Sequence, residues 1–196
     1  MTMLVLLSHK DNVILAADKR EVFFHDEIRF DVISDEVNKI LSWNGGYISG
    51  CGYVPLLDKI KSIAIDSKTW TYDHILTALQ DEIRNGNYHP HWINTTTFTS
   101  IFQTRTGYKA VYTQAQDIKA FCIEEGGCLI LVNNVDTSSF KQALNELLSF
   151  SDIDLGKIIE ILKELFRYAS RSNGTVSAEF DLAIINNGGK GLASVG

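Results

Sequence analysis

The first 51 residues contain short apolar segments separated by polar turns, a pattern that predicts paired strands. The first two segments are rich in Leu, Val, Ile and Ala, and the polar turn Lys10-Asp11-Asn12 separates them. Asn44-Gly45 separates the next two segments, and this dipeptide is well suited to a tight turn between strands. The sequence therefore predicts two hairpins, made of residues 3–8 with 12–18 and of residues 37–42 with 46–51.

Between residues 53 and 86 the spacing of apolar side chains changes to that of amphipathic helices. Residues 53–66 carry apolar side chains three or four positions apart, which is the helical repeat. A second helix is predicted over residues 73–85, with Asp73 as its N-cap and Asn85-Gly86 at its end. The apolar positions of the first helix are Val54, Leu57, Ile60, Ile63 and Ala64.

The rest of the chain repeats this order of strands followed by helices. The order favours two packed sheets flanked by pairs of helices, because strands that are apolar on both faces must be covered on both sides. A chain of 196 residues is long enough to bury such a core, so we expect one domain over residues 1–196. The predicted strands are 97–104, 108–113, 118–123, 128–132, 179–186 and 191–195, and the predicted helices are 138–150 and 154–171.

Composition and charge argue against several classes of function. The net charge is -6 and no cluster of Lys and Arg runs through the sequence, so we expect no nucleic-acid partner. No uncharged apolar run reaches ~18 residues, and no basic segment precedes an apolar one at the N-terminus. We therefore expect no membrane segment and a cytoplasmic protein.

The cysteines and histidines do not form a metal-binding pattern. Cys51, Cys122 and Cys128 lack the paired spacing of metal ligands, and their odd number indicates reduced thiols. His89 and His91 have the spacing of a pair on a strand, but no carboxylate or cysteine accompanies them, so a loop is favoured. We expect no metal and no cofactor.

The residue that most clearly suggests a catalytic role is Thr2, directly after Met1. If Met1 is removed, Thr2 carries a hydroxyl and a free amine, which are a nucleophile and a base in one residue. An α-amine with a pKa of about 7.7–8.0 can accept the hydroxyl proton without an imidazole. Many ordinary chains also begin Met-Thr, so the threonine alone decides nothing.

The surrounding residues resemble the opening hairpin of proteasome β subunits and of bacterial HslV. Val13-Ile14-Leu15-Ala16-Ala17-Asp18-Lys19-Arg20 fits the "V-x-x-A-A-D-x-R" motif of that family without a gap. Val37-Asn38-Lys39-Ile40 is similar to the strand that carries the family's lysine, and Gly46 to Gly52 is similar to its "A-G-L" strand end. The likeness fades after about residue 66. It implies an α+β fold, the four-layer αββα sandwich of the N-terminal-nucleophile (Ntn) hydrolases.

The resemblance also implies a catalytic set. Lys39 corresponds to an ammonium beside the Thr2 hydroxyl, Asp18 to its carboxylate partner, and Gly50 to a backbone N–H that binds the oxyanion. Ser138 and Ser170 are the nearest candidates for the family's supporting residues, although Ser170 stands where an aspartate is usual. The residues similar in position to the substrate pocket are Glu21, Val37, Ile48 and Gly52, and a glutamate there could favour basic side chains.

The residues alone leave other interpretations open. Lys39 could equally be an ordinary surface lysine, and Asp18 could form a salt bridge with a neighbouring basic residue. Gly50 could be an ordinary glycine at the end of a strand. Ser138 also fits a helix N-cap.

Together the motifs favour a threonine-type hydrolase that cleaves peptide amide bonds through an acyl ester on Thr2. The expected partners are a peptide or protein substrate, further copies of the chain in a homo-oligomeric ring, and an ATP-dependent unfoldase. Two alternatives remain: a non-catalytic ring subunit, and an amidase that acts on a small acyl substrate.

Overall fold

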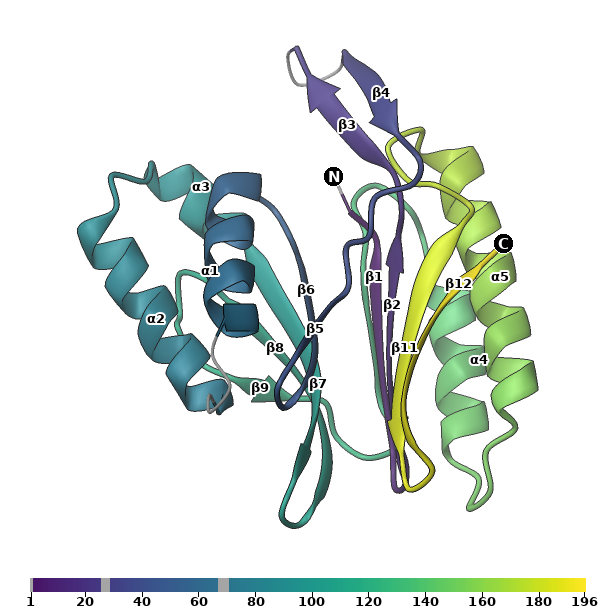
Figure 1. Cartoon of the computed structure of the whole chain (residues 1–196). Helices are drawn as coiled ribbons and strands as arrows, with labels where there is room; N and C mark the ends of the chain where they lie inside the picture. Colours follow the sequence, from purple (N-terminus) through teal and green to yellow (C-terminus); the bar gives the residue numbers. More distant parts are fainter. Residues whose placement is uncertain (1, 26–28, 67–70) are drawn as a thin grey trace.

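The structure, a computed structural model, describes residues 2–25, 29–66 and 71–196 and arranges them in four layers (Figure 1). Two five-stranded sheets lie face to face, and a pair of helices covers the outer face of each. This is the predicted αββα sandwich.

The first sheet is antiparallel, with the order β10-β1-β2-β11-β12. It consists of β1 (Leu4–His9), β2 (Asn12–Asp18), β10 (Cys128–Leu131), β11 (Phe180–Asn186) and β12 (Gly189–Val195), and is covered by α4 (Ser138–Leu148) and α5 (Leu155–Ser172).

The second sheet is also antiparallel, with the order β5-β6-β7-β8-β9. It consists of β5 (Leu41–Trp43), β6 (Gly46–Cys51), β7 (Thr97–Thr104), β8 (Gly107–Gln114) and β9 (Phe121–Cys122). On its outer face lie α1 (Val54–Asp66) and α2 (Tyr72–Asn85), and the short α3 (Pro90–Asn94) leads from α2 into β7.

The alternation of side chains along β1 explains why the molecule has four layers. Leu4 and Leu6 point into the core between the two sheets, whereas Val5 and Leu7 point toward α4 and α5. Successive side chains of a strand face opposite ways, so a strand that is apolar at every position must be covered on both faces. The continuous apolar run near the N-terminus is thus a central strand.

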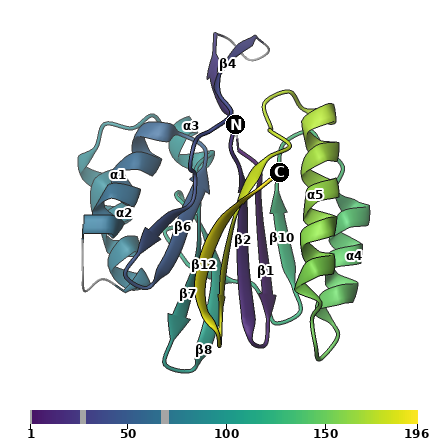
Figure 2. The same cartoon turned by 45° about the vertical axis from the view of Figure 1, so that its right-hand side comes forward.

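A third, two-stranded sheet was not predicted from the sequence. It consists of β3 (Glu21–Phe24) and β4 (Phe30–Ser34), which pair as an antiparallel hairpin at one end of the sandwich. Phe23 is 57% exposed and Ile33 is 61% exposed, so the hairpin lacks the half-buried alternation by which strands are recognised. The start of β1 lies at the same end of the molecule in both views (Figures 1 and 2).

The strand predicted over residues 37–42 is too long, because β5 begins only at Leu41. Val37 N–H donates to the carbonyl of Lys19, and the Lys39 carbonyl accepts hydrogen bonds from the side chains of Ser49 and Lys61. These bonds replace a strand ladder, so Lys39 lies in the irregular segment before β5.

Three further predictions of local structure were wrong. Thr71, not Asp73, is the N-cap of α2. The loop expected around His89 is α3, which has His89 as its N-cap and a proline in its first turn, a favoured position for that residue. The strand expected over residues 118–123 is reduced to β9, because Ile118 has a φ of 49° that ends the preceding turn.

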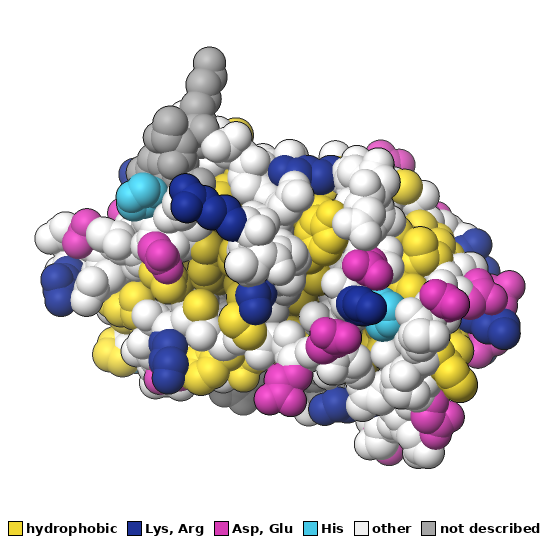
Figure 3. Space-filling model, turned by 90° about the horizontal axis from the view of Figure 1, so that it is seen from below, with side chains coloured by type: hydrophobic (Ala, Val, Ile, Leu, Met, Phe, Trp, Pro, Cys, Tyr) yellow, Lys and Arg dark blue, Asp and Glu magenta, His cyan; other side chains and the backbone are white. Residues whose placement is uncertain are grey.

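The end of the sandwich opposite the β3–β4 hairpin shows Lys and Arg interspersed with Asp and Glu (Figure 3). Within the described ranges, no helix is long and apolar enough to cross a membrane.

Candidate active site

Thr2 lies directly before β1, where two cavities meet. It is half-buried, and both cavities are lined by Thr2 and Gly52. The smaller cavity has a volume of about 200 Å³ and extends toward Lys39 and α1. The larger has a volume of about 890 Å³ and extends toward the β3–β4 hairpin and α3. The side chain of Thr2 is therefore accessible from two sides.

Asp18 and Lys39 form a buried ion pair at this place. Asp18, at the end of β2, has no exposed surface, and its Oδ1 accepts hydrogen bonds from Lys39 Nζ at 3.0 Å and from Met3 N–H at 2.7 Å. Its Oδ2 accepts one from Arg20 N–H at 3.0 Å. Because Met3 follows Thr2 directly, the carboxylate joins the start of the chain to the lysine.

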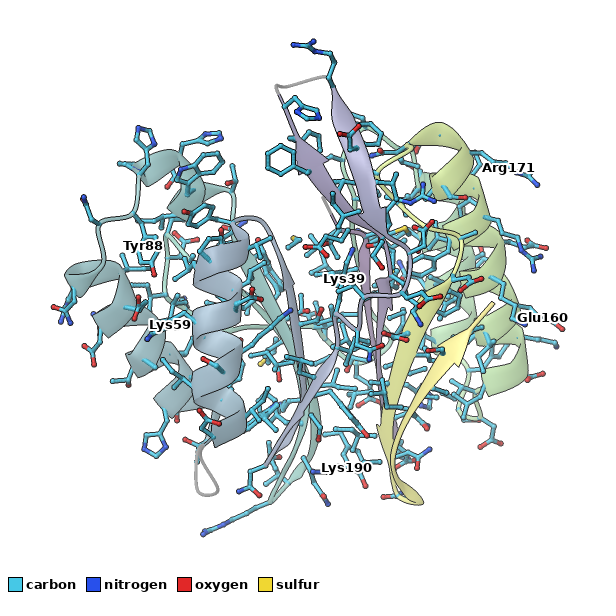
Figure 4. All side chains as sticks on the ribbon, turned by 45° about the horizontal axis from the view of Figure 1, so that its top comes forward. Lys39, Lys59, Tyr88, Glu160, Arg171 and Lys190 are labelled. Carbon is cyan, nitrogen blue, oxygen red and sulfur yellow. The ribbon has the colours of Figure 1, made fainter. Side chains whose placement is uncertain are left out.

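The surroundings of Lys39 differ from those of a surface lysine. Lys39 is 8% exposed, and its Nζ also donates to the carbonyl of Arg20. Burial lowers the pKa of Lys39, and the neighbouring Asp18 carboxylate opposes that shift. Figure 4 shows Lys39 in the interior, below the β3–β4 hairpin.

The basic neighbours of Asp18 in the sequence have other partners. Arg20 pairs with Asp35 at 2.6 Å, and Lys19 lies 3.8 Å from Asp181. The ion-pair partner of Asp18 is therefore Lys39, and not the adjacent Lys19 or Arg20.

Gly50 and Gly52 stand where a side chain would collide with neighbouring atoms. A Cβ at Gly50 would lie 2.5 Å from Leu57 Cδ2, and Gly50 lines the smaller cavity. Gly52 has a φ of +119°, and a Cβ there would lie 2.5 Å from the Thr95 carbonyl oxygen. Packing therefore requires glycine at both positions, and both glycines line the smaller cavity beside Thr2.

The structure brings some of the predicted substrate residues to Thr2 but not all of them. Glu21 and Val37 line the smaller cavity, Glu21 from an exposed position on β3. Ile48 does not line it: this side chain is fully buried in the core between the second sheet and α1.

Ser138 and Ser170 line neither cavity beside Thr2. Ser138 begins α4 and its Oγ donates to Asp136 at 2.7 Å. Ser170 Oγ donates to the carbonyl of Arg167 within α5. The hydroxyls bond within their own segments, so the structure does not bring these predicted residues to the site.

Ser177 forms a hydrogen bond to the carboxylate of the ion pair, and this contact was not predicted from the sequence. It is buried; its Oγ accepts a hydrogen bond from Lys19 N–H at 2.9 Å, and its own N–H donates to Asp18 Oδ2 at 3.4 Å. Ser177 lies in the segment after α5, whose sequence carries no motif. Its role depends on a contact across 159 positions of the chain.

Lys61 was also missed. It belongs to α1, is 7% exposed and lines the smaller cavity, and its Nζ donates to the Lys39 carbonyl at 3.2 Å. Burial lowers the pKa of Lys61 to about 8. A signal was present, because Lys61 lies four positions after Leu57 and three before Ala64, on the predicted apolar face of the helix.

Cys51 carries a further nucleophilic side chain near Thr2. It lines the larger cavity, and burial raises its pKa to about 11, so its thiol stays protonated and unreactive at neutral pH. In the part of the chain that the structure describes, no group of three His, Cys, Asp or Glu side chains is placed to bind a metal.

Comparison with solved structures assigns the fold. The chain matches the Anbu (Gly-1) mutant from Hyphomicrobium sp. strain MC1 with a TM-score of 0.72 and 14% sequence identity, over 100% of this chain and 86% of that one. The chain therefore has the proteasome-like Ntn-hydrolase fold. No family model and no curated protein matches the sequence.

These findings correct the family assignment drawn from the first 66 residues. The motifs resemble proteasome β subunits and HslV, but the chain matches an Anbu structure, and the 14% identity supports a shared fold and no more. The assignment to the β-subunit and HslV family is wrong as stated.

Proposed function

We propose that this protein is an Ntn hydrolase whose nucleophile is Thr2 after removal of Met1, which lies outside the described residues. The observation that supports this best is the convergence on one cavity of Thr2, Gly50 and Lys39, with Lys39 in a buried ion pair to Asp18. The Ntn-hydrolase fold is consistent with it.

In the proposed reaction, the free amine of Thr2 accepts the proton of its own hydroxyl as Oγ bonds to the carbonyl carbon of an amide. The ammonium of Lys39 stabilises the forming alkoxide, and Asp18 keeps that lysine charged. The backbone N–H of Gly50 donates to the oxyanion, a contribution of about 3 kcal/mol for a well-placed donor.

The carbon–nitrogen bond then breaks, and the departing amine takes the proton held by the Thr2 amine. The acyl group remains as an ester on Oγ. Water attacks this ester, its proton passes to the Thr2 amine, and cleavage of the ester bond releases a carboxylic acid and restores the threonine. We propose a peptide as the substrate, because the two cavities leave room for groups on either side of an amide.

Two measurements test this function. The intact mass of the purified protein is expected to lack one methionine, which frees the Thr2 amine. An electrophile that acylates N-terminal threonines is expected to label the protein, and Thr2→Ala is expected to abolish labelling. Thr106→Ala is the matched control, because Thr106 is exposed in the β7–β8 turn. A retained Met1 together with absent labelling would indicate a non-catalytic protein.

We further propose that the protein associates with copies of itself. Tyr72 is buried and offers no surface to a second copy, and Trp70 lies outside the described residues. The support comes instead from the β3–β4 hairpin, where Phe23 and Ile33 are more than half exposed. Light scattering at micromolar concentration is expected to give a mass well above the 21.9 kDa of one chain. A monomer alone would contradict this proposal.

A further inference from the structure

The smaller cavity contains a buried lysine that the proposed reaction does not use. Lys61 comes from α1, and 93% of its surface is removed from solvent, since it is 7% exposed. An ammonium has three donors. Among the described residues, Lys61 Nζ has one hydrogen-bond acceptor, the Lys39 carbonyl, which Ser49 Oγ also contacts at 2.9 Å. Two donors of Lys61 are left for a ligand.

The other cations of this cavity have carboxylate partners. Lys39 pairs with Asp18 at 3.0 Å, and Arg20 pairs with Asp35 at 2.6 Å. Within the described ranges, no carboxylate lies within ion-pair distance of Lys61. A buried charge is costly unless it is paired, so, of the described residues that line this cavity, Lys61 is the cation that a bound anion would stabilise.

Two carboxylates line the same cavity, but both are exposed. Glu21 lies on β3, and Asp58 lies one helical turn before Lys61 on α1. Water and salt screen exposed charges, whereas a buried charge acts at close range with little screening. The buried lysine therefore outweighs these carboxylates for a group that enters the cavity.

Resting on the proposed function, we propose that the smaller cavity binds the acidic side chain of a substrate, with the carboxylate of Glu or Asp on the Lys61 ammonium. A volume of about 200 Å³ is below the roughly 300–1,000 Å³ of pockets that enclose whole ligands, so it suits a single side chain. The rest of the substrate extends past Thr2 into the larger cavity.

The charge of Lys61 makes this binding dependent on pH. Its pKa of about 8 reflects burial, with Asp58 and Cys51 opposing the shift and Lys39 adding to it. Glu21 faces the same cavity. Lys61 is charged at pH 7 and loses its proton as the pH rises past about 8, so acid binding is expected to be strong at pH 6–7 and to weaken above pH 8.

The test uses the full chain as the Thr2→Ala variant, so that binding is measured without turnover. The probes are two acetylated tripeptides that differ only in a final Glu or Gln, and calorimetry measures their affinities. We expect the Glu peptide to bind about 10–100-fold more tightly, as for a hydrogen bond to a charged group. A further Lys61→Met substitution is expected to remove this preference, and Lys61→Arg to retain part of it.

Lys59→Met is the matched control. It lies on the same helix, is exposed, and is on the other side of α1 from Lys39 (Figure 4), so the preference is expected to persist. Circular dichroism checks that each variant folds; methionine suits the apolar face of α1, and replacing a buried charge in this way is often tolerated.

Three outcomes would overturn the inference: equal affinity for the Glu and Gln peptides, a preference that survives in Lys61→Met, or tighter binding of a third acetylated tripeptide that ends in Lys and is otherwise identical. The last would assign the cavity to Glu21 and to basic side chains. Failure of the hydrolase proposal is seen separately, as a wild-type protein that the threonine-directed electrophile does not label.

Discussion

The two cavities that meet at Thr2 differ in size and in the chemistry of their walls. The smaller one, of about 200 Å³, has charged side chains from β3, α1 and the segment before β5 among its lining residues. The larger one, of about 890 Å³, is lined mainly by aromatic and aliphatic side chains. In it, the rings of Tyr53 and Trp92 stack at 5.2 Å with an angle of 18° between their planes.

This difference indicates that the two cavities have different roles in substrate recognition. Charged groups at fixed positions discriminate strongly, because a mismatched group leaves a buried charge unpaired. An aromatic wall contributes binding through area and accepts groups of varied shape. We therefore expect the smaller cavity to set specificity and the larger cavity to set affinity for bulky groups.

The largest expected effect follows from breaking the ion pair beside the smaller cavity. Asp18→Ala leaves Lys39 buried without a partner, and the free energy of unfolding is expected to fall by about 3–5 kcal/mol. Chemical denaturation measures it. Asp35→Ala is the matched control: Asp35 is exposed, and loss of its pair with Arg20 is expected to cost at most about 1 kcal/mol. Equal effects would show that burial of the pair is unimportant.

A smaller effect is expected on the other side of Thr2. Trp92 is 43% exposed and contacts Tyr53, so Trp92→Ala removes part of the aromatic wall. Substrates with a bulky apolar group are expected to lose about tenfold in kcat/KM, while small polar amides lose little. Phe150→Ala, at an exposed residue remote from both cavities, is the control. Equal losses for both kinds of substrate would contradict the role of the larger cavity in binding bulky apolar groups.

The smallest effect is a shift in the pH profile. Activity is expected to rise as the Thr2 amine loses its proton and to fall as Lys39 does, which gives a bell shape. Burial lowers the pKa of Lys39 and Asp18 raises it. Asp18→Asn therefore lowers the pKa of Lys39 and moves the descending limb to lower pH. A uniform loss of activity with both limbs unmoved would leave Asp18 with a structural role only.

The periodicity of the sequence was sufficient to predict most elements of the sandwich. The run of apolar residues in β1 and β2, and the helical repeats of α1 and α5, report which faces are buried, and this information is local. The β3–β4 hairpin escaped prediction because its exposed phenylalanines give no buried face. The prediction of Asp73 as the N-cap of α2 was wrong because Thr71 and Asp73 are both favoured N-cap residues, and the helix begins after Thr71.

The sequence by itself determined the candidates Thr2, Asp18 and Lys39, because they lie in a short motif near the N-terminus. The motif resemblance implied that Asp18 pairs with Lys39, and the tertiary structure decided this against a salt bridge to Lys19 or Arg20. Only the tertiary structure showed that Ser177 hydrogen-bonds to that pair and that Lys61 has no carboxylate partner among the described residues. The physical reason is distance in sequence. A hydrophobic repeat reports whether a side chain is buried, but the partner of a buried charge depends on how α1, β2 and the segment after α5 pack together.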